Sequence, residues 1–113
     1  MGRTRIYQKH DLPSGIVSIA ISVISDYDRR KKEISKGALS ESVLSEYARL
    51  NLIVDGALLC VENSFRDALV NDIIHGNGYR YSMLSSLVCK TGYYDRKRTV
   101  IYLVAVGLGL WNK

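Results

Sequence analysis

Six candidate DNA-binding residues, each basic or aromatic, lie in the last third of the chain. They are Arg80, Lys90, Tyr94, Arg96, Lys97 and Arg98. Three of these cations are consecutive, and no charged residue follows them between Thr99 and Asn112. A helix that enters the major groove needs donors and cations near its N-terminus and an apolar remainder that anchors it in a core. The pattern therefore predicts DNA contacts by Tyr94 and residues 96–98, with Arg80 and Lys90 binding flanking phosphates.

The elements around these residues indicate how they would be positioned. A short apolar helix over residues 82–88 is expected, then a tight connection over residues 89–92 with Thr91 as the helix cap. A last helix would run from Tyr93 to about residue 108. Helix, short turn and basic helix form the pattern of a helix-turn-helix. The alternative is a helical hairpin with a basic rim, and in both cases we expect Tyr93 in the core and Tyr94 exposed.

The preceding part of the chain predicts a helical scaffold. The chain has one proline, Pro13, and a helix over residues 14–35 is favoured over a strand, although the β-branched residues 17–23 also alternate. Gly37 should end this helix and Ser40 should cap the next. That second helix is expected from residue 41 to 75, either bent near Gly56 or paired antiparallel with the first, before the break at residues 76–78.

Charge is distributed unevenly along the chain. The net charge is +5 and the pI about 9.3. Residues 37–75 carry two bases against six acids, whereas residues 76–113 carry six bases and only Asp95 as an acid. Such asymmetry suggests that the C-terminal third contacts a polyanion. The alternative is a basic face that is simply solvated.

Other classes of function find little support in the sequence. Cys60 and Cys89 form no CxxC pair, and with only His10 and His75 to join them a zinc site is not expected. No catalytic triad, phosphate-binding glycine loop or paired carboxylate motif is present, so we expect no enzyme activity and no cofactor. The longest apolar run, residues 16–24, is about half of the ~20 residues that span a bilayer. We therefore expect a cytoplasmic protein with no membrane contact.

Several segments resemble a known family. They are residues 26–34 (DYDRRKKEI), 46–51 (EYARLN), 72–79 (DIIHGNGY), 93–98 (YYDRKR) and 107–110 (GLGL). Over roughly residues 20–110 the chain resembles the ArpU and RinA group of phage transcriptional regulators from Gram-positive hosts. The chain departs from the family pattern at Ser85-Ser86-Leu87, where an Ile-Ala pair is usual. The resemblance implies an all-α fold with a C-terminal helix-turn-helix similar to region 4 of sigma factors, and activation of late phage genes.

Together these observations predict an all-α protein. Residues 1–13 would form a basic N-terminal arm, residues 14–75 a long helical scaffold, and residues 79–113 the helix-turn-helix DNA-binding region. The expected function is sequence-specific promoter recognition inside the bacterial host cell. Expected partners are double-stranded DNA, host RNA polymerase and a second copy bound along the long helix. The alternative function is a small helical packaging or adaptor protein similar to a small terminase subunit. A third option is a helical partner protein that does not bind DNA.

Overall fold

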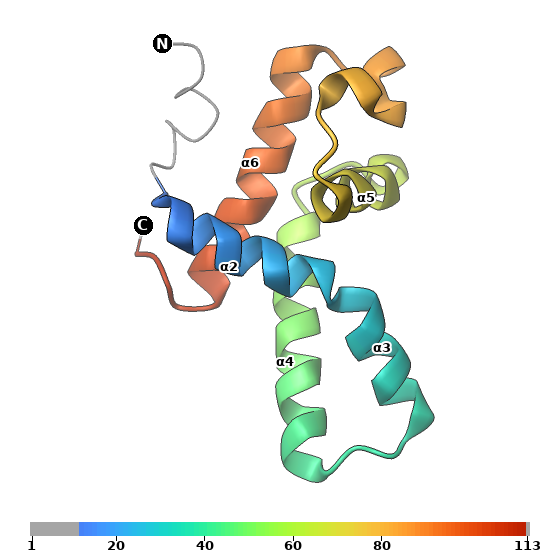
Figure 1. Cartoon of the computed structure of the whole chain (residues 1–113), viewed down its shortest axis with the longest axis vertical. Helices are drawn as coiled ribbons and strands as arrows, with labels where there is room; N and C mark the ends of the chain where they lie inside the picture. Colours follow the sequence, from blue (N-terminus) through green and yellow to red (C-terminus); the bar gives the residue numbers. More distant parts are fainter. Residues whose placement is uncertain (1–11, 113) are drawn as a thin grey trace.

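Helices make up the whole regular structure of residues 12–112, the part of the chain that the computed structural model describes (Figure 1). The α-helices are α2 (Ser14–Ser25), α3 (Tyr27–Lys36), α4 (Glu41–Leu58), α5 (Arg66–His75) and α6 (Lys90–Gly107). Three short 3₁₀ turns are η1 (Asn63–Phe65), η2 (Tyr79–Tyr81) and η3 (Met83–Ser86). The prediction of an all-α fold is confirmed. Most of the predicted basic arm, residues 1–11, lies outside the described residues.

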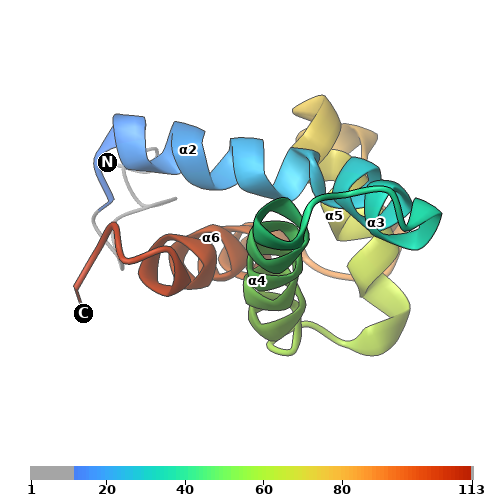
Figure 2. The same ribbon diagram turned by 90° about the horizontal axis from the view of Figure 1, so that it is seen from below.

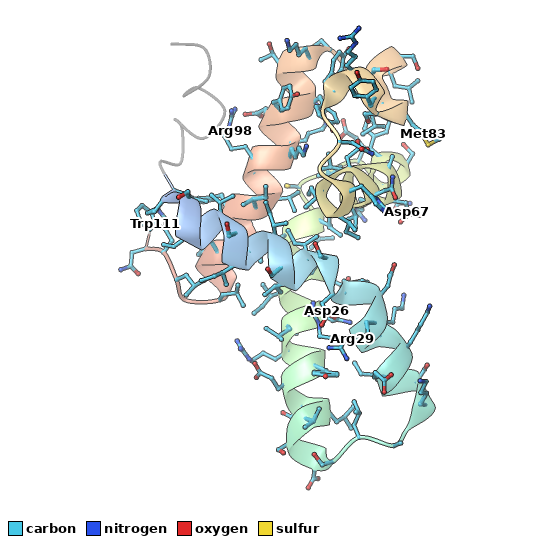
Figure 3. The ribbon with its side chains drawn as sticks, viewed as in Figure 1. Asp26, Arg29, Asp67, Met83, Arg98 and Trp111 are labelled. Carbon is cyan, nitrogen blue, oxygen red and sulfur yellow. The ribbon has the colours of Figure 1, made fainter. Side chains whose placement is uncertain are left out.

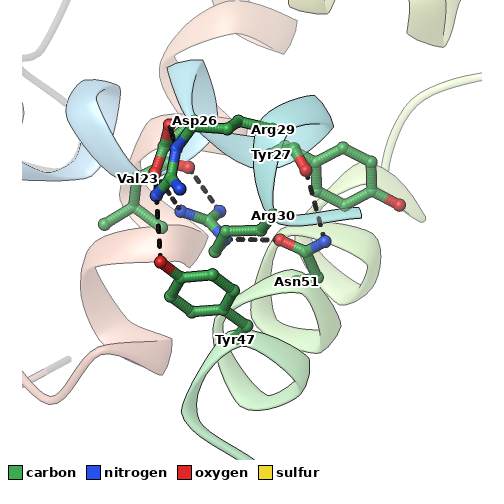
Figure 4. A network of polar contacts seen from close by, with 7 residues as sticks. All are labelled: Val23, Asp26, Tyr27, Arg29, Arg30, Tyr47 and Asn51. Carbon is green, nitrogen blue, oxygen red and sulfur yellow. Dashed lines mark hydrogen bonds and ion pairs between the residues drawn. The ribbon is translucent and has the colours of Figure 1, made fainter. Parts of the chain in front are cut away.

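The first predicted helix is in fact two helices that meet at Asp26. Arg30, on α3, is 2% exposed and donates from Nη2 to the carbonyl of Val23 at 2.6 Å. Its Nε donates to Asn51 of α4 at 2.6 Å (Figure 4). Arg29 closes the corner with two hydrogen bonds to the Asp26 carboxylate. The prediction of one helix over residues 14–35 was wrong because polar side chains, which the apolar periodicity does not register, stabilise a corner.

The α3–α4 hairpin projects from the rest of the molecule (Figure 1). Gly37 follows α3 with a φ of 72°, a left-handed conformation that glycine adopts without strain. Ser40 caps α4 by accepting a hydrogen bond from the amide of Val43. Both helix boundaries agree with the sequence prediction. The antiparallel partner of α4 is α3, the second half of the predicted first helix.

The second predicted helix is also interrupted, and the break is not at Gly56. Gly56 lies within α4, whereas the chain leaves the helix after Leu58. Asn63 begins η1, and Arg66 donates from Nε to the carbonyl of Val61 at 2.8 Å. A side-chain donor thus satisfies a backbone acceptor in the break, which stabilises the turn between α4 and α5. The apolar periodicity continues across the turn, and for this reason it predicted one helix.

The core lies where α2 crosses α4 and α6 (Figure 2). Its fully buried side chains include Ala20 and Ile24 of α2, Val54 of α4, and Val100 and Val104 of α6. The predicted scaffold (residues 14–75) and the predicted DNA-binding region (residues 79–113) therefore share one core.

None of the helices within residues 12–112 is long and apolar enough to cross a membrane.

The C-terminal region differs from the predicted helix-turn-helix. The short helix expected over residues 82–88 is the four-residue turn η3, and Ser82 accepts a hydrogen bond from the amide of Leu84 there. Serine side chains that bind nearby amides favour turns over helices. The helix α6 begins at Lys90 rather than Tyr93. Cys89 caps it in place of the predicted Thr91, accepting from the amide of Gly92 at 3.4 Å.

Candidate nucleic-acid interface

Arg96 lies against the turn between α4 and α5. It forms two hydrogen bonds to the carboxylate of Glu62, at 2.9 Å from Nε and 2.6 Å from Nη2. Its Nη1 donates to the carbonyl of Gly92 at 3.0 Å. Hydrogen bonds from Arg96 lower the pKa of Glu62 from its ordinary value to about 2. Arg96 therefore connects α6 to the scaffold rather than extending freely from the helix.

Lys97 points toward the connection that follows α5. Its Nζ donates to the carbonyl of Asn77 at 2.7 Å and lies 5.4 Å from the centroid of the Tyr93 ring. Burial of the amine lowers the pKa of Lys97. The ammonium group of Lys97 thus binds a backbone carbonyl of the protein itself.

Tyr93 contacts the same connection after α5 from the side of the core. The Tyr93 side chain is fully buried, and its hydroxyl donates to Asp72 at 2.9 Å. Asp72 is 2% exposed and also accepts from the side chain of Asn77 at 3.3 Å. Burial and the neighbouring Asp72 carboxylate raise the pKa of Tyr93. The prediction that Tyr93 faces the core is confirmed.

Tyr94 and Arg98 are less accessible than the sequence suggested. Tyr94 is half-buried, and its hydroxyl accepts a hydrogen bond from the amide of Tyr79 at 3.2 Å, so the expectation of an exposed Tyr94 was wrong. Arg98 forms an ion pair with Asp95 at 2.6 Å, and its side chain is only 10% exposed. It leaves the side of α6 rather than the N-terminal end of the helix (Figure 3).

The two remaining predicted residues, Arg80 and Lys90, are exposed. With Tyr81, Leu87 and Thr91 they belong to the segment around the start of α6, where η2 and η3 pack against this helix (Figure 1). We call these five residues the basic end. The sequence has no acid between Asp72 and Asp95. Within residues 12–112, neither Arg80 nor Lys90 forms an ion pair. The two cations of the basic end are therefore exposed and form no ion pair with an acidic side chain within residues 12–112.

A second surface feature is a groove of about 680 Å³ between α3, α4 and α5. Apolar side chains such as Leu58, Val70 and Ile74 line it. Its charged residues are Asp28, Asp55, Asp67, Lys31 and Arg66. Because acids outnumber bases here, the groove is a poor site for a polyanion. The described residues hold no cluster of three or more His, Cys, Asp or Glu that could bind a metal ion.

Sequence reasoning missed the exposure of Tyr81, which is 74% exposed, and of Leu87, which is 66% exposed. The absence of acids from Ile73 to Tyr94 indicates a basic segment, but no local signal in the sequence marks these two apolar side chains as exposed. Comparisons of the chain with models of known families, with curated proteins and with solved structures found no match.

Proposed function

We propose that this protein is a DNA-binding transcriptional regulator that contacts double-stranded DNA through the basic end. The observation that carries the proposal is the exposure of Arg80 and Lys90 within a segment that has no acid. Cations in such a setting gain free energy by releasing counterions from phosphates. Lys90 is also the first residue of α6, where the helix dipole favours an anion.

The proposal changes the roles that the sequence suggested for the basic run. Arg96 and Lys97 bind groups of this protein, at Glu62 and Asn77, so we assign them to positioning α6. Lys90 and Arg80 become the principal phosphate contacts. Thr91, exposed in the first turn of α6, is placed to add a hydroxyl contact.

The finer parts of the proposal rest on the family resemblance. These are regulation of late phage genes, promoter recognition similar to that of sigma region 4, and contact with host RNA polymerase. The basic end supports DNA contact without specifying a sequence, because phosphate contacts position a protein but do not read bases. The alternative is a packaging or adaptor role, and selection from a random-sequence library distinguishes it from a regulatory role.

The test compares two variants that each lose two positive charges. Arg80→Ala/Lys90→Ala changes the basic end, and Lys31→Ala/Lys32→Ala changes two exposed lysines of α3. Binding to a short random-sequence duplex is measured over a range of salt concentrations. We expect the first variant to lower the slope of log K against log salt by about one unit for each lost contact. The α3 variant should keep the wild-type slope.

Equal slopes for the wild type and Arg80→Ala/Lys90→Ala would overturn the proposed interface. Selection from a random-sequence duplex library then tests the regulatory role. Enrichment of a common sequence by the wild-type protein supports a regulator. A pool without any enriched sequence contradicts it and favours the packaging or adaptor alternative.

A further inference from the structure

The basic end carries apolar surface that phosphate binding does not explain. Tyr81 is 74% exposed and Leu87 is 66% exposed, on either side of η3. Phosphate oxygens offer no apolar surface for these side chains to bury. Of these two side chains, Tyr81 lies beside Arg80, which forms no ion pair within residues 12–112. This pair offers a ligand both a positive charge and an aromatic face.

Arg80 places its positive charge over one face of the Tyr81 ring and leaves the other face of this exposed ring open to a ligand. The guanidinium carbon of Arg80 lies 5.7 Å from the centroid of the Tyr81 ring. Aromatic rings and guanidinium planes are the groups on which proteins stack nucleobases, and stacking tolerates any base because each base has a π face. The pair therefore has the chemistry of a base-stacking site next to a phosphate-binding cation.

The backbone that carries this pair is held firmly. The single hydroxyl proton of Tyr79, the residue before Arg80, is shared between the carbonyls of Ser85 at 2.7 Å and Val88 at 2.8 Å. These contacts fix η2 against the segment that leads into α6. Arg80 and Tyr81 thus extend from an ordered turn, which reduces the conformational entropy lost when a ligand binds.

We propose that Tyr81, supported by Arg80, stacks on an unpaired base, so that the basic end binds DNA with unpaired bases more tightly than fully paired duplex. In a duplex the base faces are covered by their neighbours, whereas an unpaired base exposes a face to an aromatic side chain. Lys90 then binds the adjoining phosphates. This inference rests on the proposed DNA contact of the basic end and specifies the form of DNA that it prefers.

The test measures binding of three fluorescently labelled DNAs of equal length: an oligothymidine, a fully paired duplex and a duplex with a central unpaired segment. Tyr81→Ala should bind the two DNAs with unpaired bases about tenfold more weakly, as loss of one stacked base predicts. Its binding to the paired duplex should change little. Leu52→Ala removes a side chain of α4 that is 70% exposed and should bind all three DNAs as the wild type does.

Two further variants separate stacking from other uses of the side chain. Tyr81→Phe should keep the wild-type preference, and Tyr81→Leu should lose it. Equal loss in Tyr81→Phe would mean that the hydroxyl makes the contact, and retention in Tyr81→Leu would mean that any apolar group suffices. Either result overturns the inference.

The same measurements distinguish this inference from the proposed function. If Arg80→Ala/Lys90→Ala weakens duplex binding while Tyr81→Ala binds every DNA normally, the interface stands and the stacking is wrong. Wild-type protein that prefers the paired duplex also overturns the stacking alone. If Arg80→Ala/Lys90→Ala leaves all three affinities unchanged, the proposed interface itself is wrong.

Discussion

The two groups of cations in the C-terminal third differ in what surrounds them. Residues 96–98 are consecutive on α6, and each forms a hydrogen bond or an ion pair within the protein, with Glu62, Asn77 and Asp95 respectively. Arg80 and Lys90 are not adjacent in sequence, and both are exposed near the start of that helix. Three consecutive helical residues cannot share one face, because each is rotated by about 100° from the last. A basic run is therefore weaker evidence for a binding surface than scattered cations in a segment without acids.

The α3 run shows the same behaviour. Arg29 forms hydrogen bonds with Asp26, and Arg30 is buried against Asn51 and Val23. The neighbouring Lys31 and Lys32 are exposed. In this protein the arginines within basic runs make structural contacts, which agrees with the ability of a guanidinium to bind several acceptors at once.

The largest expected effect of this difference is on stability. Arg96→Ala/Lys97→Ala/Arg98→Ala should lower the free energy of unfolding by about 2–4 kcal/mol, since it removes charged hydrogen bonds that are partly buried. Arg80→Ala/Lys90→Ala should cost no more than about 0.5 kcal/mol for each substitution, because these positions are exposed. Urea denaturation followed by circular dichroism measures both. A triple variant as stable as the wild type would show that the basic run does not hold the fold.

A smaller effect is expected from the pH dependence of the Arg96–Glu62 pair. The pKa of Glu62 falls from 4.5 to about 2 in the folded protein. A depressed carboxyl pKa stabilises the fold fully above about pH 4.5, and this contribution is lost as the pH falls toward 2. The stability difference between the wild type and Glu62→Gln should therefore favour the wild type at neutral pH and shrink in acid. Because Glu62 is half-exposed, we expect a small difference. A difference that stays constant over this range would contradict the pairing.

The sequence predicted the helical class and several boundaries for local reasons. Ser40 caps the N-terminus of α4, and Gly37 ends α3 in a left-handed conformation. Both features depend only on residues close in sequence. The corner at Asp26 depends on Asn51, which is distant in sequence, so periodicity alone could not reveal it. Likewise, the burial of Lys97 depends on the path of the chain at Asn77. Local signals predicted the end of α3 and the start of α4, whereas tertiary contacts set the corner at Asp26 and decided which cations remain exposed.

The most direct test of the proposed interface is an amide NMR titration of the full chain with a short DNA duplex. The proposed interface predicts that the largest chemical-shift changes cluster in residues 79–91. Exposed basic residues of α3, such as Lys31 and Lys32, should change little. Changes centred on α3 or α4, with residues 79–91 unaffected, would contradict the central claim that this protein contacts DNA through Arg80 and Lys90.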